Sequence, residues 1–465
     1  MAHARPRRLI ALVLLAGVTL FIGAWLGATP RLSAAQSPVT PVAMGGGEFV
    51  FGPGDEMSAA AAAAILAEIA QNQEKLYRTG RLALPEAGAT VALAWPLRPA
   101  VDFVDFSYYA VSNFVDNDPA FPDSVRDYNN GTRTYDTDSG YNHGGTDYFL
   151  WPFGWLKMDN NAVEVVAAAA GVIVGKSDGN GDRSCGYTTN PWNAVYVQHA
   201  DGTIAWYGHL KRNSLTTKAV GAAVVTGEYL GLVGSSGFST APHLHFEIRS
   251  GSSSGSQAVD PYFGPGNPTL LQSLWQSQPG YYDSAILHLG AGAAQPVFPP
   301  CPQQEQPHEQ QLFDRGDTVL LSAYYRDQRQ DQVSEIRVLR PDGTVHAAWT
   351  HASPALYYMA SYWWWSIVIP ESTQNGEWRY QVTYQGKLHE RSFFVGEMPP
   401  PTATMTVTPT PTATTGLTGT LTSTPTPTTT PSPTLTTPPD DEGTPNAYPS
   451  PVEISGFQFL PYVIQ

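Results

Sequence analysis

Cysteine and charged residues are scarce in this chain of 465 residues, and its net charge is negative. The two cysteines, Cys185 and Cys301, are too few for a disulfide-stapled scaffold or a thiolate zinc site. They allow one disulfide, which the sequence by itself does not show. Lys, Arg, Asp and Glu make up 14% of the residues, against about 25% in soluble domains. The formal net charge of −15 argues against nucleic-acid binding and against docking on anionic lipid, because both need a basic face.

A long apolar run lies near the start of the chain. Residues 9–28 carry no charge, follow an arginine-bearing start and precede small residues that end at Ala35. This order is typical of a secretory signal peptide, so we predict that residues 1–35 are removed by cleavage after Ala35. About 20 apolar residues can also span a bilayer, and an uncleaved anchor that tethers the protein to a membrane is the alternative. Both the cleaved signal peptide and the uncleaved anchor predict an extracellular or cell-surface protein.

Composition divides the rest of the chain into segments. Residues 36–91 form a glycine-bearing lead-in and a helix over 55–79, which Asp55 would cap and Gly80 would end. We assign this helix a packing or spacer role without chemistry. Short alternating segments between glycine-rich turns then predict a mainly antiparallel β-domain over residues 92–265. The predicted fold class is therefore mainly β.

A second β-rich region at residues 285–396 has the strand spacing and turn residues of a smaller, immunoglobulin-like β-sandwich. Six aromatic residues lie within 357–365. Alternate residues of a strand face inward, so core packing explains at least half of them, and glycan docking is the alternative for the others. Residues 397–455 are rich in Thr and Pro and predict a disordered stalk, and residues 456–465 form an apolar tail.

Four of the eleven histidines fall in three compact motifs. The first motif is HGGTD at residues 143–147, in which the two glycines favour a loop that enters a strand. It pairs His143 with Asp147, and imidazole and carboxylate are ordinary zinc ligands. Taken alone, this spacing is too common to assign a metal site.

The other two motifs place histidines on predicted strands. HLHFEI at residues 243–248 alternates polar and apolar side chains. His243 and His245 would therefore share one face of a strand, with the apolar residues turned into a core. His209, in YGHL, ends another strand, where a lone histidine is more often structural than catalytic.

Taken together and in order, these motifs resemble the M23 family of zinc metallopeptidases, the lysostaphin-like or LytM-like endopeptidases. The residues that carry the resemblance are HGGTD at 143–147, YGHL at 207–210 and GSSGFSTAPHLHFEI at 234–248. The resemblance covers about residues 92–262, and the ordered set is more specific than any one motif.

The resemblance implies a role for each of five residues. His143, Asp147 and His245 would bind one zinc ion in the peptidase domain and leave a fourth position for water. His209 and His243 would be the catalytic pair. One would accept a proton from water, and the other would stabilise the oxyanion or help to protonate the leaving amine.

The function implied by the resemblance is that of a secreted or surface-attached zinc metalloendopeptidase that cuts peptide cross-bridges in peptidoglycan. Two alternatives stay open: an endopeptidase that acts on proteins, and a non-catalytic module that binds cell wall or activates another enzyme. Insertions at residues 101–141, 150–164 and 176–192 depart from the family pattern. They are expected to wall the substrate groove, so the preferred bond is not carried over. Glu247 shares a face with His245 and is either a residue that orients this ligand or a solvated carboxylate.

Overall fold

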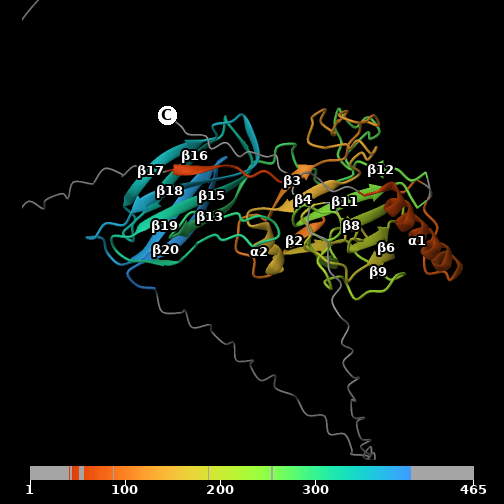
Figure 1. Ribbon diagram of the computed structural model, residues 1–465, viewed down its shortest axis with the longest axis horizontal. Coiled ribbons are helices and arrows are strands. Elements are labelled where there is room, and N and C mark those ends of the chain that lie inside the picture. The colour runs from red at the N-terminus through yellow and green to blue at the C-terminus, as the bar shows by residue number, and fades with distance from the viewer. Residues whose placement is uncertain are drawn as a thin grey trace, which may run out of the picture. The chain divides into compact units, whose positions relative to one another are not determined.

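The computed structural model describes residues 41, 44–51, 57–86, 88–186, 188–252 and 255–398. The predicted signal peptide or anchor, nearly all of the Thr/Pro-rich segment and the apolar tail lie outside these residues. Within them, we find no helix that is both long enough and apolar enough to cross a membrane. The described part of the chain is mainly β, with two α-helices, α1 (Ala59–Arg78) and α2 (Gly154–Asp159), as Figure 1 shows.

Two sheets build the region that carries the histidine motifs. The larger sheet is antiparallel and has, in spatial order, β3 (Tyr109–Asn113), β4 (Thr146–Leu150), β11 (His243–Arg249), β8 (Ile204–Gly208), β7 (Ala194–Gln198), β6 (Gly171–Ser177) and β9 (Ala223–Val224), with β12 (Ala258–Val259) paired to β11. The smaller sheet has β10 (Tyr229–Leu232), β5 (Val163–Val166) and β2 (Leu97–Pro99). The pairing of β11 with both β4 and β8 brings the three histidine motifs together.

The two faces of the larger sheet have different coverings. The predicted apolar face of β11 is confirmed, because Leu244, Phe246 and Ile248 are buried in one core with residues of the smaller sheet. On the other face, Ile69 and Leu76 of α1 pack in a separate cluster with side chains of β6, β7 and β8. Burying one such side chain stabilises the fold by roughly 1.5–3 kcal/mol. The helix thus lies on the face to which His243 and His245 point.

The predicted start of α1 is wrong. The helix begins after Ser58, whose side-chain hydroxyl accepts a hydrogen bond from the Ala61 amide at 3.2 Å. The predicted cap, Asp55, lies outside the described residues. Ser58 has extended backbone angles, as an N-cap residue requires, and the alanines that follow it have the highest helix propensity. The end is as predicted, since Gly80 follows the helix with φ +64°, where a side chain would be strained.

Two further sheets pack around a second core in residues 285–396. One contains β1 (Met44–Glu48), β18 (Tyr357–Val368), β15 (Thr318–Arg329) and β13 (Ala285–Gly292). The other contains β14 (Leu312–Phe313), β20 (Lys387–Val395), β19 (Gly376–Tyr384), β16 (Val333–Leu339) and β17 (Val345–Ala352). All pairings are antiparallel except that of β14 with β20.

Strand β1 was not predicted, because glycine-rich segments have low strand propensity. Its residues pair with β18, and Gly45 lies opposite Trp364. A Cβ atom at Gly45 would come within 2.5 Å of the Trp364 ring, so this close approach requires glycine. Trp363 and Trp365 point into the core, as the alternation predicts for part of the aromatic cluster.

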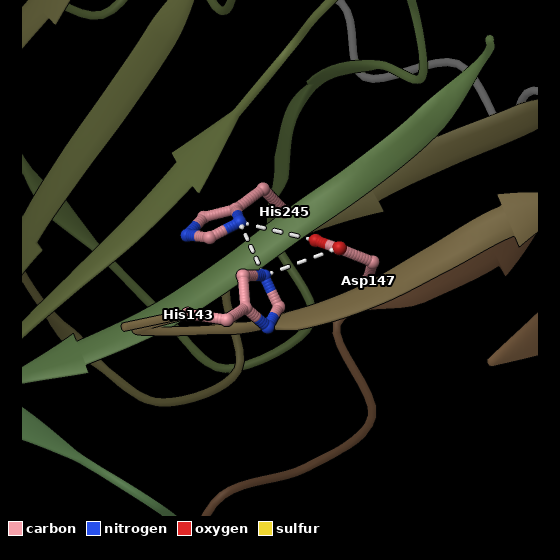
Figure 2. A group of neighbouring side chains, drawn as sticks. All are labelled: His143, Asp147 and His245. Carbon is pink, nitrogen blue, oxygen red and sulfur yellow. Dashed lines mark hydrogen bonds and ion pairs between the residues drawn. The ribbon is translucent and has the colours of Figure 1, made fainter. Parts of the chain in front are cut away.

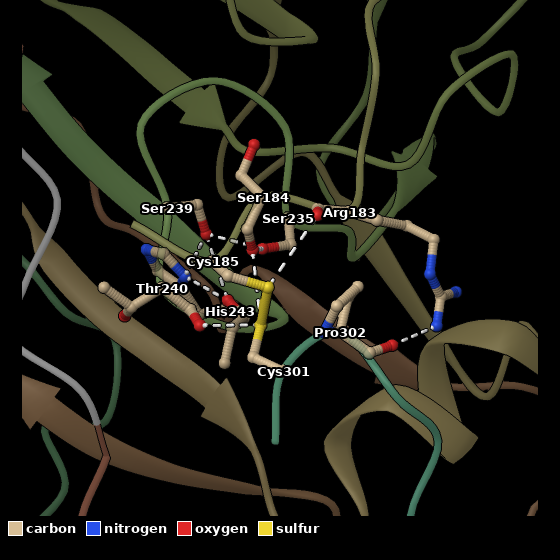
Figure 3. Close-up of a disulfide and its surroundings, with 10 residues drawn as sticks. Arg183, Ser184, Cys185, Ser235, Ser239, Thr240, His243, Cys301 and Pro302 are labelled. Carbon is tan, nitrogen blue, oxygen red and sulfur yellow. Dashed lines mark hydrogen bonds between the residues drawn. A yellow bond between two sulfur atoms is a disulfide. The ribbon is translucent and has the colours of Figure 1, made fainter. Parts of the chain in front are cut away.

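The described residues of the two β-regions belong to one compact unit, so the second region does not stand apart as a separate one. Arg133 forms a buried ion pair with Asp327 at 3.2 Å, which joins the two regions. A disulfide between Cys185 and Cys301 adds a covalent link, which Figure 3 shows beside the turn that leads to His243. The two cysteines therefore do pair.

Candidate metal centre and catalytic site

His143, Asp147 and His245 come together on neighbouring elements, as Figure 2 shows. His143 ends the loop before β4, Asp147 lies on β4, and His245 on β11 is the direct register partner of Asp147. One donor atom from each residue lies within 4.8 Å of the others, and all three side chains are buried. His143 Nε2 is 3.1 Å from Asp147 Oδ2, and His245 Nδ1 is 3.0 Å from Asp147 Oδ1.

Each histidine of this group uses its second ring nitrogen elsewhere. His143 Nδ1 donates to the carbonyl oxygen of Phe114 at 2.7 Å, and His245 Nε2 donates to Glu247 at 3.2 Å. In a neutral imidazole the other nitrogen then carries a lone pair. Two imidazole lone pairs and a carboxylate therefore converge, with His143 Nε2 and His245 Nδ1 only 3.4 Å apart. Such a set fits a divalent cation, and the two outer hydrogen bonds fix the tautomer that binding needs.

Glu247 is the residue that orients His245, and the prediction of a solvated carboxylate is wrong. Its side chain is buried, and Arg249 donates to its Oε1 atom at 2.5 Å. Burial alone would raise the pKa of this carboxyl. The hydrogen bond from His245 and the positive charge of Arg249 outweigh burial and hold the pKa of Glu247 below its ordinary value. Glu247 is therefore a charged acceptor.

Glycines in HGGTD allow this close packing. A Cβ atom at Gly145 would lie 2.6 Å from Nε2 of His245, and one at Gly144 would lie 3.0 Å from Oε1 of Glu247. A larger residue at Gly145 would displace the imidazole. The loop therefore needs glycine for the approach to β11.

His209 and His243 face each other beside the three candidate ligands. Their ring centroids are 4.4 Å apart, and His243 Nε2 lies 3.9 Å from Asp147 Oδ1. His209 Nδ1 donates to the Ser236 carbonyl at 2.6 Å, and His243 Nδ1 donates to the Ala241 carbonyl at 2.8 Å. Both rings are thereby held with Nε2 as the nitrogen that can exchange a proton.

His209 sits in an uncommon backbone conformation. Its φ is +58°, in the left-handed region that non-glycine residues seldom adopt. The edge of the ring packs against Trp192, with centroids 5.0 Å apart. Backbone strain of this kind persists where the surroundings hold the residue, and it is common at functional sites.

The sequence did not single out several residues that support the site. Phe114 supplies the carbonyl that holds His143, and Tyr135 stacks on the same ring at 4.7 Å. The Asn113 side chain donates a hydrogen bond to Asp147 Oδ2 at 2.9 Å. The ring of Trp192 packs against that of His209. Phe114 and Tyr135 come from the insertion at 101–141, which was predicted only to wall a groove. Its richness in aromatic residues was the available signal.

Two cavities open beside the site. One, of about 440 Å³, includes His209, Trp192 and Phe238 in its lining. The other, of about 520 Å³, includes His143 and Glu247. Met57 and Ser58, at the start of α1, line both. His209 thus borders one cavity, and His143 borders the other.

Part of the chain is similar to known peptidases. Residues 155–261 match the model of Peptidase family M23. Over 125 residues the chain is 34% identical to the glycyl-glycine endopeptidase ALE-1 of Staphylococcus capitis, a match that covers 26% of this chain and 29% of that protein. Over 85 residues it is 45% identical to the DD-carboxypeptidase/endopeptidase Mpg of Neisseria meningitidis serogroup B, covering 18% of this chain and 17% of that protein. The chain thus spans less than a third of the length of either relative.

A solved structure is also similar. The catalytic domain of lysostaphin from Staphylococcus simulans is 27% identical, with 33% of this chain and 89% of that chain covered. The TM-score of this match is 0.22. The family match includes His209, His243 and His245, and it begins after His143 and Asp147. The chain contains a domain of peptidase family M23 at residues 155–261.

Proposed function

We propose that this protein is a zinc metalloendopeptidase that hydrolyses peptide bonds in the cross-bridges of peptidoglycan. The observation that carries the proposal is the convergence of His143, Asp147 and His245, with their outer hydrogen bonds already made, next to a facing pair of histidines. Two imidazoles and a carboxylate, with a coordination position left open, are typical of catalytic rather than structural zinc.

His143 Nε2, Asp147 and His245 Nδ1 would hold the zinc ion. When bound there, zinc supplies a Lewis acid for the scissile carbonyl group and makes water acidic enough to react near neutral pH. Phe114 and Glu247 keep the two imidazoles in the tautomer and orientation that binding requires.

His209 and His243 would move the protons of the reaction. Each ring is held at Nδ1 by a backbone carbonyl, so proton exchange takes place at Nε2. One ring accepts the proton that the attacking water loses, and the other supports the developing oxyanion or helps to protonate the leaving amine. The 4.4 Å separation of the rings lets both reach one peptide group.

A location outside the cytoplasm is part of the proposal. The disulfide between Cys185 and Cys301 supports it, because disulfides persist in oxidising compartments. The predicted signal peptide or anchor in residues 1–35 also supports this location. The names of the relatives, a glycyl-glycine endopeptidase and a DD-carboxypeptidase/endopeptidase, support peptide bonds of the cell wall as the substrate.

The test is digestion of isolated peptidoglycan by the full-length protein, with and without a chelator. We expect soluble fragments with new amino termini inside the peptide bridges, and no release when the chelator is present. Intact peptidoglycan together with cleavage of unfolded proteins would favour the protein-substrate alternative. Intact peptidoglycan that retains the bound protein, with no cleavage of any peptide, would favour the non-catalytic module.

A further inference from the structure

The cavity beside His209 is lined in part by a helix that lies outside the matched family region. Helix α1 contributes one face to it, and that face repeats at helical spacing from Ala61 through Ala64 and Ile65 to Glu68. The opposite wall comes from the insertion at 176–192, including Trp192. The cavity therefore combines a helix outside the matched family region with residues inside that region.

The walls of this cavity are mainly apolar. Ile65, Pro191, Trp192 and Phe238 contribute aliphatic and aromatic surface next to the catalytic pair. Such walls favour the methylene groups of a substrate side chain over a water-filled space, at roughly 0.8 kcal/mol for each buried CH₂ group. A substrate residue with a long aliphatic stem fits this part of the cavity.

A single carboxylate lines the same cavity. Glu68 is the only Asp or Glu among the described residues that line the cavity, and no Lys or Arg lines it there. No ion pair involving Glu68 is formed within the described part of the chain. The charge is therefore uncompensated and exposed to an incoming cation.

Contacts join the aromatic residues beside His209. His209 packs against Trp192 with ring centroids 5.0 Å apart, and Trp192 Nε1 donates to the Tyr196 hydroxyl at 2.8 Å. These three residues and Glu68 line the same cavity. An ammonium group that passes the indole also gains a cation–π interaction.

We propose that this cavity is a specificity subsite for a peptide residue whose aliphatic side chain ends in an ammonium group, with Glu68 as the counter-charge. The inference rests on the proposed endopeptidase function and names a residue that the substrate carries next to the cleaved bond. Apolar walls take the stem, and the carboxylate of Glu68 takes the charge.

The test uses the full-length protein and synthetic peptides that span the bond cut in peptidoglycan. Each peptide carries lysine or norleucine on one side of that bond, so that the two differ only in the ammonium group. We expect kcat/KM to be about fivefold higher for lysine, which is the upper range for one exposed charge pair. Glu68→Gln should abolish the preference, and Glu68→Lys should reverse it.

Glu74 on the same helix provides the matched control. It is exposed, is not among the described residues that line the cavity, and forms an ion pair with Arg78 at 3.7 Å. Glu74→Gln should keep the full lysine preference. Both glutamates are on the surface of α1, so the thermal midpoint of every variant should match that of the unaltered protein.

The outcomes distinguish a failure of the proposed subsite from a failure of the proposed endopeptidase function. Equal cleavage of lysine and norleucine peptides, or an unchanged preference in Glu68→Gln, would overturn the subsite while leaving the endopeptidase intact. Failure of the unaltered protein to cut peptidoglycan or any peptide would overturn the proposed function, and the subsite with it.

Discussion

Glu247→Ala is the substitution that tests most sharply how the fold prepares the metal centre. Glu247 accepts a hydrogen bond from His245 Nε2 at 3.2 Å and one from Arg249 at 2.5 Å. Truncation removes the group that fixes the tautomer of one candidate ligand. It also leaves the guanidinium of Arg249 without its carboxylate.

The two losses have separate magnitudes. Losing a partner that orients a metal ligand costs about 10- to 100-fold in metal affinity, or about 1.4–2.7 kcal/mol. Breaking a buried ion pair costs about 3–5 kcal/mol of folding free energy. We expect the lower end here, because Arg249 keeps a hydrogen bond to the Ser256 carbonyl at 2.8 Å and packs over Trp206 at 5.0 Å.

Zinc affinity is measured by competition with a chelator of known affinity, and stability by urea unfolding of the zinc-free protein. Glu247→Gln should recover most of the affinity, because its amide oxygen can still accept from His245. Glu164→Ala is the control. Its carboxylate pairs with Arg98 at the surface, where a pair contributes about 0–1 kcal/mol. Zinc binding by folded Glu247→Ala that is as tight as in the unaltered protein would refute the reasoning.

Three other predictions concern catalysis, the disulfide and pH. His209→Ala should lower the rate of hydrolysis by about 10²- to 10⁴-fold with unchanged zinc content. The control is His199→Ala, which removes a buried histidine held by the Ala170 carbonyl and should keep the activity. Loss of zinc in His209→Ala would contradict the assigned role. Reduction of the disulfide, which closes a separation of 116 residues, should lower the free energy of unfolding by about 2–4 kcal/mol in urea titrations with and without reductant, and an unchanged midpoint would refute this. Burial raises the pKa of Asp260 to about 7, so the folded state binds a proton that the unfolded state loses above about pH 4. The stability of the unaltered protein relative to Asp260→Asn should therefore fall by about 2 kcal/mol in total as the pH rises from 5 to 7. Parallel stability curves would contradict this.

The strand pattern could be predicted because it depends on local order in the sequence. Alternation in HLHFEI fixes which side chains of β11 face the core, and it holds in the structure. The five site residues were predicted from the resemblance of the ordered motifs to the M23 family. The structure brings His143, Asp147 and His245 together because β4 and β11 pair in register.

The supporting residues could not be predicted because they depend on contacts between distant segments. The Phe114 carbonyl reaches His143 across 29 positions, and nothing in the local sequence marks a backbone oxygen as a partner. Strand β1 forms only because β18 offers an open edge where glycine fits against Trp364. The start of α1 was misplaced because two residues near it, Asp55 and Ser58, can both act as caps.

Crystallographic location of zinc at its absorption edge tests the central claim most directly. Crystals of the full-length protein, grown with one equivalent of zinc, should show one anomalous peak bonded to Nε2 of His143, the carboxylate of Asp147 and Nδ1 of His245. His143→Ala, prepared in the same way, should lack the peak. A zinc ion bound elsewhere, or a site that stays empty in a folded protein with all three ligands present, would contradict the account.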